Sequence, residues 1–337
     1  MRGCESSTDG TSRVVASPLR QPSRLPGAGP ARDGAAARFH DERRCARTHP
    51  RAVAAQLVTA PQQPSPAAER DDVRRVRVTD YLTFYEIVDG VLLRRMEPIE
   101  LVYRRSGGGG PTLVCLHSVT AASGFADGLV QALDGRADVL AVDLRGFGAS
   151  PRPTHEYTVD LWVEDVLKLL ADAGCESPPI IYGHGLGACI AVALAARGVG
   201  GGLAVSGVAL APGEPAALAP LSDLAERGDD LLGPLGELTG VAPAGEDLTP
   251  QIVARCIGAW RAFDGIAPAE GLAVPSIVFS AADDRVAALD AVGGPEWLAE
   301  TAGARRISLL GGHELPRAQP QAMARALTDW FDEVEVR

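Results

Sequence analysis

Several ionisable side chains of this 337-residue chain directly follow short apolar runs, and the ends of such runs are where a sheet delivers catalytic groups. His313 follows one such run near the end of the chain, and the adjacent Asp283 and Asp284 follow an earlier one. A carboxylate beside a histidine fixes the imidazole tautomer and stabilises its protonated form, so such a pair can act as a general base. His313 with one of these aspartates is therefore the candidate catalytic pair.

The elements that must position these groups alternate along the chain. Four strand-like segments come first, at 73–78, 82–88, 91–93 and 99–103, and they predict an antiparallel entry to a sheet. Beyond the glycines at 107–110, helical segments alternate with apolar strands expected at 112–116, 139–142, 180–182, 205–210, 276–280 and 306–310. Such alternation is typical of a doubly wound, mostly parallel α/β sheet with helices on both faces. Between residues 212 and 268, Leu/Ala-rich helical pieces predict a small cap inserted before the late strands.

Composition divides the chain near residue 72. Residues 1–75 hold 13 Arg against 8 acidic residues, yet the whole chain has a formal net charge of −11 at pH 7. The first 72 residues are rich in Pro, Ala and Arg without helical or strand periodicity, which predicts a disordered basic leader followed by one domain over 73–337. The acidic body argues against nucleic-acid binding, and no apolar run approaches the roughly 20 residues of a membrane helix. Six cysteines without zinc-type spacing are typical of reduced thiols in a cytoplasmic protein.

Five segments in a fixed order resemble the α/β-hydrolase superfamily, at residues 111–120, 141–150, 180–190, 275–283 and 310–313. In that superfamily they correspond to a His-Gly oxyanion loop, a D-x-R-G-x-G-x-S loop, a G-x-S-x-G nucleophile elbow, an acid after a late strand and a histidine after the last strand. The resemblance implies the α/β-hydrolase fold and makes His313 the catalytic histidine. Spacing from the preceding strand favours Asp283 over Asp284 as the acid.

The sequence departs from this pattern at two positions. Gly185 stands where the elbow has its serine, and Ser118 stands where a glycine usually follows the oxyanion-loop histidine. Glycine enters the strained elbow without a Cβ clash, so the turn is expected to persist while covalent acyl transfer from position 185 loses its attacking oxygen. The missing side chain is expected to leave space beside His313 for water or a substrate hydroxyl. The resemblance also implies an oxyanion hole built from the amides of Val119 and Leu186.

Residues around this implied site have both functional and structural interpretations. His117, Ser118 and His184 are candidates for substrate binding, although hydrogen bonds that stabilise the turns would also account for them. Asp143 and Arg145 are expected to brace their loop. Cys189, one helical turn past the elbow, is expected to pack in the core rather than to replace the nucleophile. No metal site and no cofactor is expected.

Three functions are compatible with these residues. The favoured one is a cofactor-independent enzyme that uses His313 and Asp283 as a general base with a backbone oxyanion hole, for hydrolysis, C–C cleavage or cyclisation. The second is a catalytically silent binding or regulatory protein, similar to the N-myc downstream-regulated proteins, which have this fold without a working triad. The third is an ordinary serine esterase with a substitution at residue 185. Apolar residues of the expected cap predict a lipophilic small-molecule substrate: Leu231, Leu232, Leu235, Ile257, Trp260 and Phe263.

Overall fold

The computed structural model describes residues 72–88, 90–153, 157–175, 177–213, 215–227, 229–240 and 249–335. The leader predicted over residues 1–72 lies outside this part of the chain except for Asp72. The described residues contain one eight-stranded sheet in the order β1-β2-β4-β3-β5-β6-β7-β8. Its strands are β1 (Asp72–Val88), β2 (Val91–Gly107), β3 (Thr112–Leu116), β4 (Asp138–Asp143), β5 (Ile180–His184), β6 (Gly202–Ser206), β7 (Ser276–Ala281) and β8 (Arg305–Leu309).

The sheet is mixed, as the sequence predicts. β1 pairs with β2 and β2 with β4 in antiparallel fashion, whereas every later pair is parallel. The parallel strands β4 to β7 are buried along their whole length, so they appear in the sequence as continuous apolar runs without alternation. β6 begins and ends earlier than the predicted 205–210, at Gly202 and Ser206.

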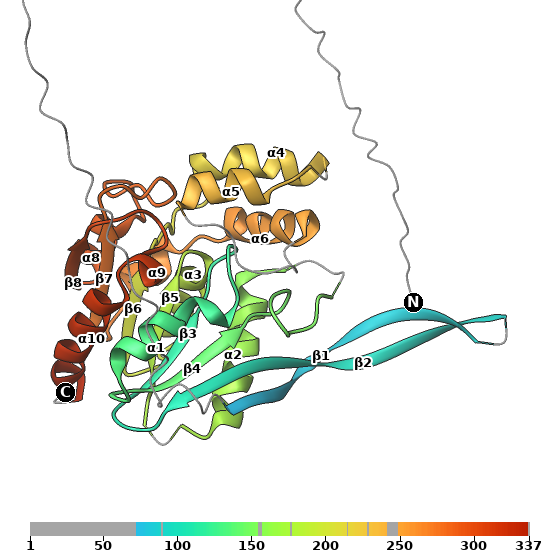
Figure 1. Cartoon of the computed structure of the whole chain (residues 1–337), viewed down its shortest axis with the longest axis horizontal. Coiled ribbons are helices and arrows are strands. Elements are labelled where there is room, and N and C mark those ends of the chain that lie inside the picture. The colour runs from blue at the N-terminus through green and yellow to red at the C-terminus, as the bar shows by residue number, and fades with distance from the viewer. Residues whose placement is uncertain are drawn as a thin grey trace, which may run out of the picture. The chain divides into compact units, whose positions relative to one another are not determined.

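Helices cover both faces of the sheet and divide the core into two layers (Figure 1). α1 (Asp127–Leu133) and α10 (Pro320–Glu335) contribute to the core on one face, and α2 (Val159–Ala173), α3 (Leu186–Ala196) and α8 (Pro295–Thr301) contribute to the core on the other. The short helices η2 (Ser123–Ala126) and α9 (Leu315–Ala318) follow β3 and β8. No described helix is both long and apolar enough to cross a membrane.

The chain between β6 and β7 is helical, where the sequence predicts a cap. It contains η3 (Ala216–Leu218), α4 (Ala219–Arg227), α5 (Leu232–Thr239), α6 (Pro250–Ala262) and α7 (Ile266–Glu270). In Figure 1, α4, α5 and α6 form a layer of their own beside the sheet and its helices. Thr249 begins α6 by accepting a hydrogen bond from the Ile252 amide, and Pro250 occupies the first helical position.

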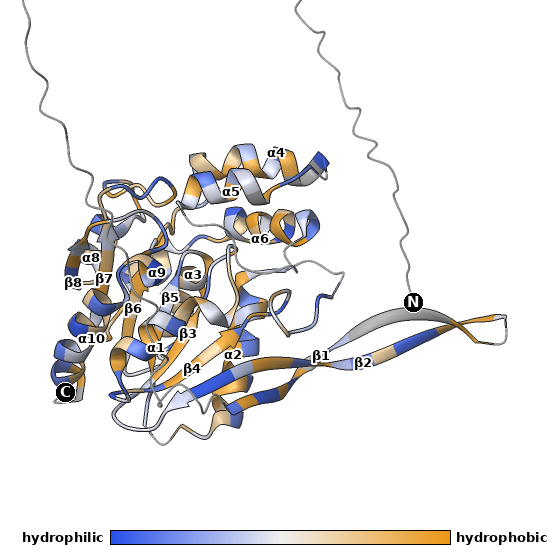
Figure 2. Ribbon diagram, in the orientation of Figure 1, coloured by the Kyte–Doolittle hydropathy of each residue, from blue (hydrophilic) through white to orange (hydrophobic). Residues whose placement is uncertain are grey.

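The antiparallel entry is a long hairpin rather than four short strands. Only residues 102–107 of β2 pair with β4, and the part of β1 and β2 toward their connecting turn projects from the sheet (Figure 1). The register shifts between Arg77 and Tyr81, which explains why the sequence pattern is interrupted there. Ile87, Leu92 and Met96 are exposed toward the tip, where apolar colour gathers in Figure 2.

The topology places a switch point, where α/β sheets form their ligand crevice, between β3 and β5. The chain leaves β3 toward β4 on one side and leaves β5 toward β6 on the other, so these neighbouring strands form the topological switch point where α/β sheets bind ligands. The last register pair of the two strands is Leu116 with Gly183. Ser118 and Gly185 each come two residues after this pair, past the ends of β3 and β5.

Candidate active site

The turn between β5 and α3 is the sharp elbow that the sequence predicts. Gly185 joins the two elements with φ 55° and ψ −118°, a conformation that L side chains rarely adopt. Its amide donates to the Ser206 carbonyl at 3.0 Å, and its carbonyl accepts from the Ala188 amide at 3.0 Å. The elbow is thus held by β6 on one side and by the first turn of α3 on the other.

His313 pairs with Asp284, not with Asp283. The Nδ1 atom of His313 lies 3.1 Å from each carboxylate oxygen of Asp284. Asp283 is exposed and forms no hydrogen bond or ion pair with His313 in the described structure. The expectation of Asp283 was wrong because β7 ends at Ala281, one residue beyond the predicted end, which moves the acid one position along the chain.

The surroundings of this pair stabilise its charges. Burial opposes ionisation of Asp284, but the hydrogen bond and charge of His313 and the amides of Ala287 and Val286 outweigh it, so the pKa of Asp284 lies below its ordinary value. Burial also disfavours a charged His313, but the hydrogen bond and charge of Asp284 and the charge of Glu314 raise its pKa above the ordinary 6.5. His313 is therefore a stronger base than a free imidazole.

Val119 and Leu186 present backbone amides at the same crevice. Leu186 is the first residue of α3, so its amide has no partner within the helix. Among the described residues, neither the Leu186 amide nor the Val119 amide donates a hydrogen bond to another group. These are the two donors that the resemblance implies for an oxyanion hole, and both are uncommitted.

The space in front of Gly185 is filled, contrary to the expectation of a vacancy. A Cβ atom built on Gly185 would lie 2.2 Å from Ser118 Oγ and 2.7 Å from Ser118 Cβ. The same point lies 3.4 Å from His313 Nε2. The side chain of Ser118 therefore occupies the volume that a residue with a side chain at position 185 would need.

His117 is structural, although it was a candidate for substrate binding. Its Nδ1–H donates to the Ser118 carbonyl at 2.7 Å, and its Nε2 accepts from the Leu144 amide at 3.0 Å. The ring is fully buried, and burial lowers the pKa of His117 to about 4. A neutral ring with both nitrogens occupied fixes the loop that carries Ser118 and leaves no atom for a substrate.

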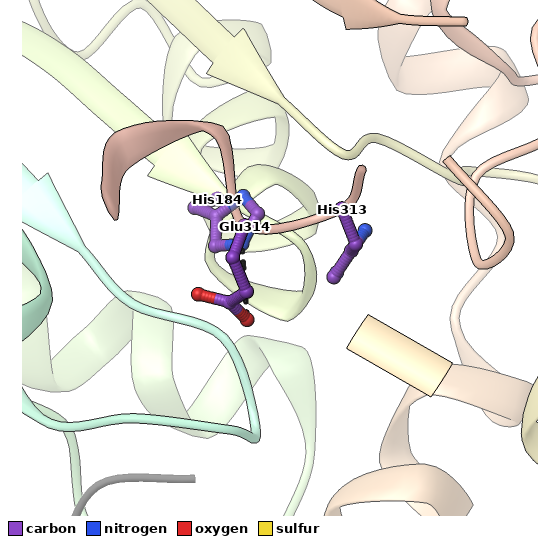
Figure 3. Close-up of side chains that lie close together, drawn as sticks. All are labelled: His184, His313 and Glu314. Carbon is purple, nitrogen blue, oxygen red and sulfur yellow. Dashed lines mark ion pairs between the residues drawn. The ribbon is translucent and has the colours of Figure 1, made fainter. Parts of the chain in front are cut away.

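His184 and Glu314 form a second buried pair beside His313 (Figure 3). His184 Nδ1 lies 3.0 Å from Ser206 Oγ, its Nε2 lies 3.6 Å from Glu314 Oε1, and its ring centroid lies 4.7 Å from that of His313. Thr120 Oγ1 donates to Glu314 Oε1 at 2.6 Å. Burial opposes the charge of Glu314, but His184, His313 and Thr120 outweigh it and hold its pKa at about 2. Glu314 was not among the residues predicted from the sequence, although an acid directly after His313 was a usable signal.

Three of these residues could in principle ligate a metal ion. One ligand atom from each of His184, His313 and Glu314 lies within 4.8 Å of the other two. Each residue already has a protein partner, namely Ser206, Asp284 and Thr120 respectively. The Asp284 carboxylate holds His313 Nδ1, so Nε2 is the nitrogen left for a ligand or a proton.

Asp143, Arg145 and Cys189 have the structural roles that the sequence predicts. The Asp143 carboxylate accepts from the Ser123 and Ala149 amides at 2.8 and 2.9 Å and so closes its glycine-rich loop. Arg145 is buried and donates two hydrogen bonds to Asp165, at 2.8 and 2.6 Å. Cys189 is fully buried, and burial raises the pKa of its thiol, so it is not an activated nucleophile.

Four of the six cap residues that suggested a lipophilic substrate pack within the core. Leu231, Leu235, Ile257 and Trp260 are at most 3% exposed. Their apolar character is explained by packing, so it is not evidence for the polarity of a substrate. His313 and Ser118 are themselves only 2% and 1% exposed.

The comparisons with known proteins agree with this fold. A family model described as "Alpha/beta hydrolase family" matches residues 113–326, more than half of the chain. A 2-(acetamidomethylene)succinate hydrolase of Mesorhizobium japonicum is 32% identical over 93 residues, which cover 28% of this chain and only 33% of that relative. The enol-lactonase from Burkholderia xenovorans LB400 has a similar structure, with 24% identity and a TM-score of 0.60 over 74% of this chain and 99% of that one. A thermophilic esterase from Thermogutta terrifontis shows 19% identity and a TM-score of 0.62 over 78% and 99% of the respective chains. The chain belongs to the alpha/beta hydrolase family.

Proposed function

We propose that this protein is a hydrolase that cleaves an acyl bond, such as an ester, thioester, lactone or amide, in a small molecule. The observation that carries the proposal is the His313–Asp284 pair, whose Nε2 atom faces the Gly185 elbow beside the two uncommitted amides of Val119 and Leu186. The relatives named above are a hydrolase, an enol-lactonase and an esterase, which supports hydrolysis over C–C cleavage or cyclisation.

The proposed chemistry divides between these groups. His313 Nε2 takes a proton from the attacking oxygen, Asp284 stabilises the resulting imidazolium, and the Val119 and Leu186 amides receive the charge that develops on the carbonyl oxygen. His313 then returns the proton to the leaving group. These steps need no cofactor. The four cysteines described by the structure, Cys115, Cys175, Cys189 and Cys256, are free, which supports a reducing, cytoplasmic location.

The experiment is a screen of p-nitrophenyl esters, acyl thioesters and lactones, followed by kinetics of His313→Ala on the best substrate. We expect kcat to fall by about 10²- to 10⁴-fold, the usual contribution of positioned proton transfer, while the affinity measured by calorimetry changes little. Added EDTA should leave the wild-type rate unchanged, which separates this mechanism from one that uses a metal at His184, His313 and Glu314. Equal turnover by His313→Ala would contradict the proposal, and binding without turnover by the wild type would favour a silent binding protein.

A further inference from the structure

Ser118 and Gly185 occupy equivalent places just beyond the ends of two neighbouring parallel strands, β3 and β5. β3 and β5 are paired up to Leu116 and Gly183, and each of the two residues lies two positions beyond its partner in that pair. Equal offsets on paired parallel strands bring both positions to the same end of the crevice. A hydroxyl carried by either position can therefore reach the same point.

The contacts of Ser118 confirm that its hydroxyl is at this point. Ser118 Oγ lies 2.2 Å from the place where the Cβ of a side chain at position 185 would be. His313 Nε2 lies 3.4 Å from that same Cβ position. The superfamily pattern has glycine after the loop histidine and serine in the elbow. In this chain the serine and the glycine have exchanged positions, and the two exchanges compensate each other sterically.

The Ser118 hydroxyl has no structural task among the described residues. It is buried, and Oγ has no hydrogen-bond partner. Other serines nearby are satisfied: Ser123 Oγ accepts from Arg104 at 3.1 Å, Ser150 Oγ donates to the Asp143 carbonyl at 2.6 Å, and Ser206 Oγ bonds Tyr182 at 2.7 Å. A buried hydroxyl without a hydrogen-bond partner destabilises the folded state. Such a loss of stability is expected for a reactive group that must stay free to attack a substrate.

We propose that Ser118 is the nucleophile of this hydrolase. The inference rests on the proposed function, because it uses His313 as the base. His313 Nε2 takes the hydroxyl proton, and Ser118 Oγ forms a bond to the acyl carbon. The bond to the leaving group then breaks, and the leaving group takes the proton from His313. Water, deprotonated in turn by His313, then attacks the acyl carbon, the bond to Ser118 Oγ breaks to release the acid, and His313 returns the proton to Ser118 Oγ.

The oxyanion donors suit an attack from either strand. Val119 directly follows Ser118, and Leu186 directly follows Gly185, so one amide always belongs to the residue after the nucleophile and the other to the residue after the opposite position. Ser118 also avoids the strained backbone of the elbow, because the only non-glycine residue with positive φ in the described chain is Asp134. Hydrogen bonds between nucleophile and base commonly tighten only when substrate binds.

The test uses a short-chain fluorophosphonate, in which a serine oxygen displaces fluoride from phosphorus, and locates the adduct by peptide mass spectrometry. We expect a stoichiometric adduct on Ser118 in the wild type, at least about a 100-fold slower reaction in Ser118→Ala and in His313→Ala, and an unchanged reaction in Ser123→Ala. The double variant Ser118→Gly with Gly185→Ser should move the adduct to position 185. This variant also shows that the probe reaches the crevice.

The outcomes separate this inference from the proposed function. A wild type without an adduct on Ser118 would overturn the inference, as would Ser118→Ala with wild-type turnover of the screened substrate. In either case, loss of turnover in His313→Ala would leave the hydrolase intact with water as its nucleophile. If neither Ser118→Ala nor His313→Ala affected turnover, both the inference and the proposed function would fail. Melting curves of each variant exclude unfolding as the cause of a loss.

Discussion

Replacing Asp284 by asparagine tests whether the carboxylate sets the tautomer of His313. Asp284 Oδ1 accepts from the Val286 and Ala287 amides at 2.8 and 2.9 Å, in addition to its contact with His313. The amide oxygen of an asparagine at this position would keep the hydrogen bonds from the Val286 and Ala287 amides. The NH₂ group of the asparagine would then face His313 Nδ1. An NH₂ donor makes Nδ1 the acceptor and puts the ring proton on Nε2. The nitrogen that faces Gly185 can then no longer take a proton.

The size and the pH dependence of the effect follow from this arrangement. Loss of the base is expected to lower kcat by about 10²- to 10⁴-fold, equivalent to about 3 to 5 kcal/mol of transition-state stabilisation. In the wild type the rate should rise with pH through a pKa above 6.5, since Asp284 outweighs the burial of His313. In Asp284→Asn burial remains while the negative charge is gone. The pKa of His313 should therefore fall, and the acid limb of the residual activity should move to lower pH.

The assay is kcat against pH from about pH 5 to 9 for the wild type, Asp284→Asn and Asp283→Asn. Asp283 is the matched control, because it lies one residue away, is exposed and undergoes the same chemical change. We expect Asp283→Asn to keep both the rate and the position of the acid limb. Equal losses in the two variants, or an acid limb that stays in place in Asp284→Asn, would refute the assignment of Asp284 as the partner of His313.

Two further substitutions test the packing around the pair. Gly207→Ala should lower kcat and the melting temperature more than its control Gly198→Ala. Both positions have positive φ and so incur backbone strain of about 1 to 2 kcal/mol. Only at Gly207 would the new Cβ meet His313, 2.6 Å from its Cε1, whereas Gly198 has open space. Glu314→Gln should destabilise the protein by on the order of 1 to 3 kcal/mol at neutral pH. Since the pKa of Glu314 is depressed to about 2, this deficit should disappear as pH falls from about 4.5 toward 2. Chemical unfolding at several pH values checks it, and a constant deficit would show that the carboxylate is not ionised in the native state.

Apolar runs and turn residues were sufficient to predict the parallel sheet. Strands buried on both faces must be continuous apolar segments, so β3, β4, β5 and β7 were predicted to within two residues at either end. β6 was predicted too late in the chain, because its first residue, Gly202, is of a type that is more common in linkers than in strands. A Cβ at Gly202 would lie 2.9 Å from the Trp330 ring, so the glycine is required by a helix that comes 128 residues later. A close approach of this kind leaves no local pattern in the sequence.

The candidate site was predicted in part, and its two failures have different causes. His313 lies beside Gly185, and Leu186 directly follows Gly185 as the first residue of α3, as the order of motifs indicates. The choice of Asp283 failed because a shift of one residue at a strand end moves a different side chain inward. The expectation of a vacancy at Gly185 was also wrong, because no single motif shows that the Ser118 side chain fills this space. Only strand pairing shows that position 118 lies opposite position 185.

The energetics of burial also point to a reactive site rather than a scaffold. Four buried side-chain atoms lack a hydrogen bond in the described structure, and three of them, Ser118 Oγ, His184 Nε2 and Glu314 Oε2, belong to residues around His313. Burying charged groups such as Asp284 and Glu314 is also costly, and apolar residues of similar size would often stabilise a fold at least as well. A protein that needed this region only for folding would have little use for two carboxylates, two histidines and an unpaired hydroxyl in one crevice. Their concentration at the switch point of the sheet is what proton transfer and acyl attack require.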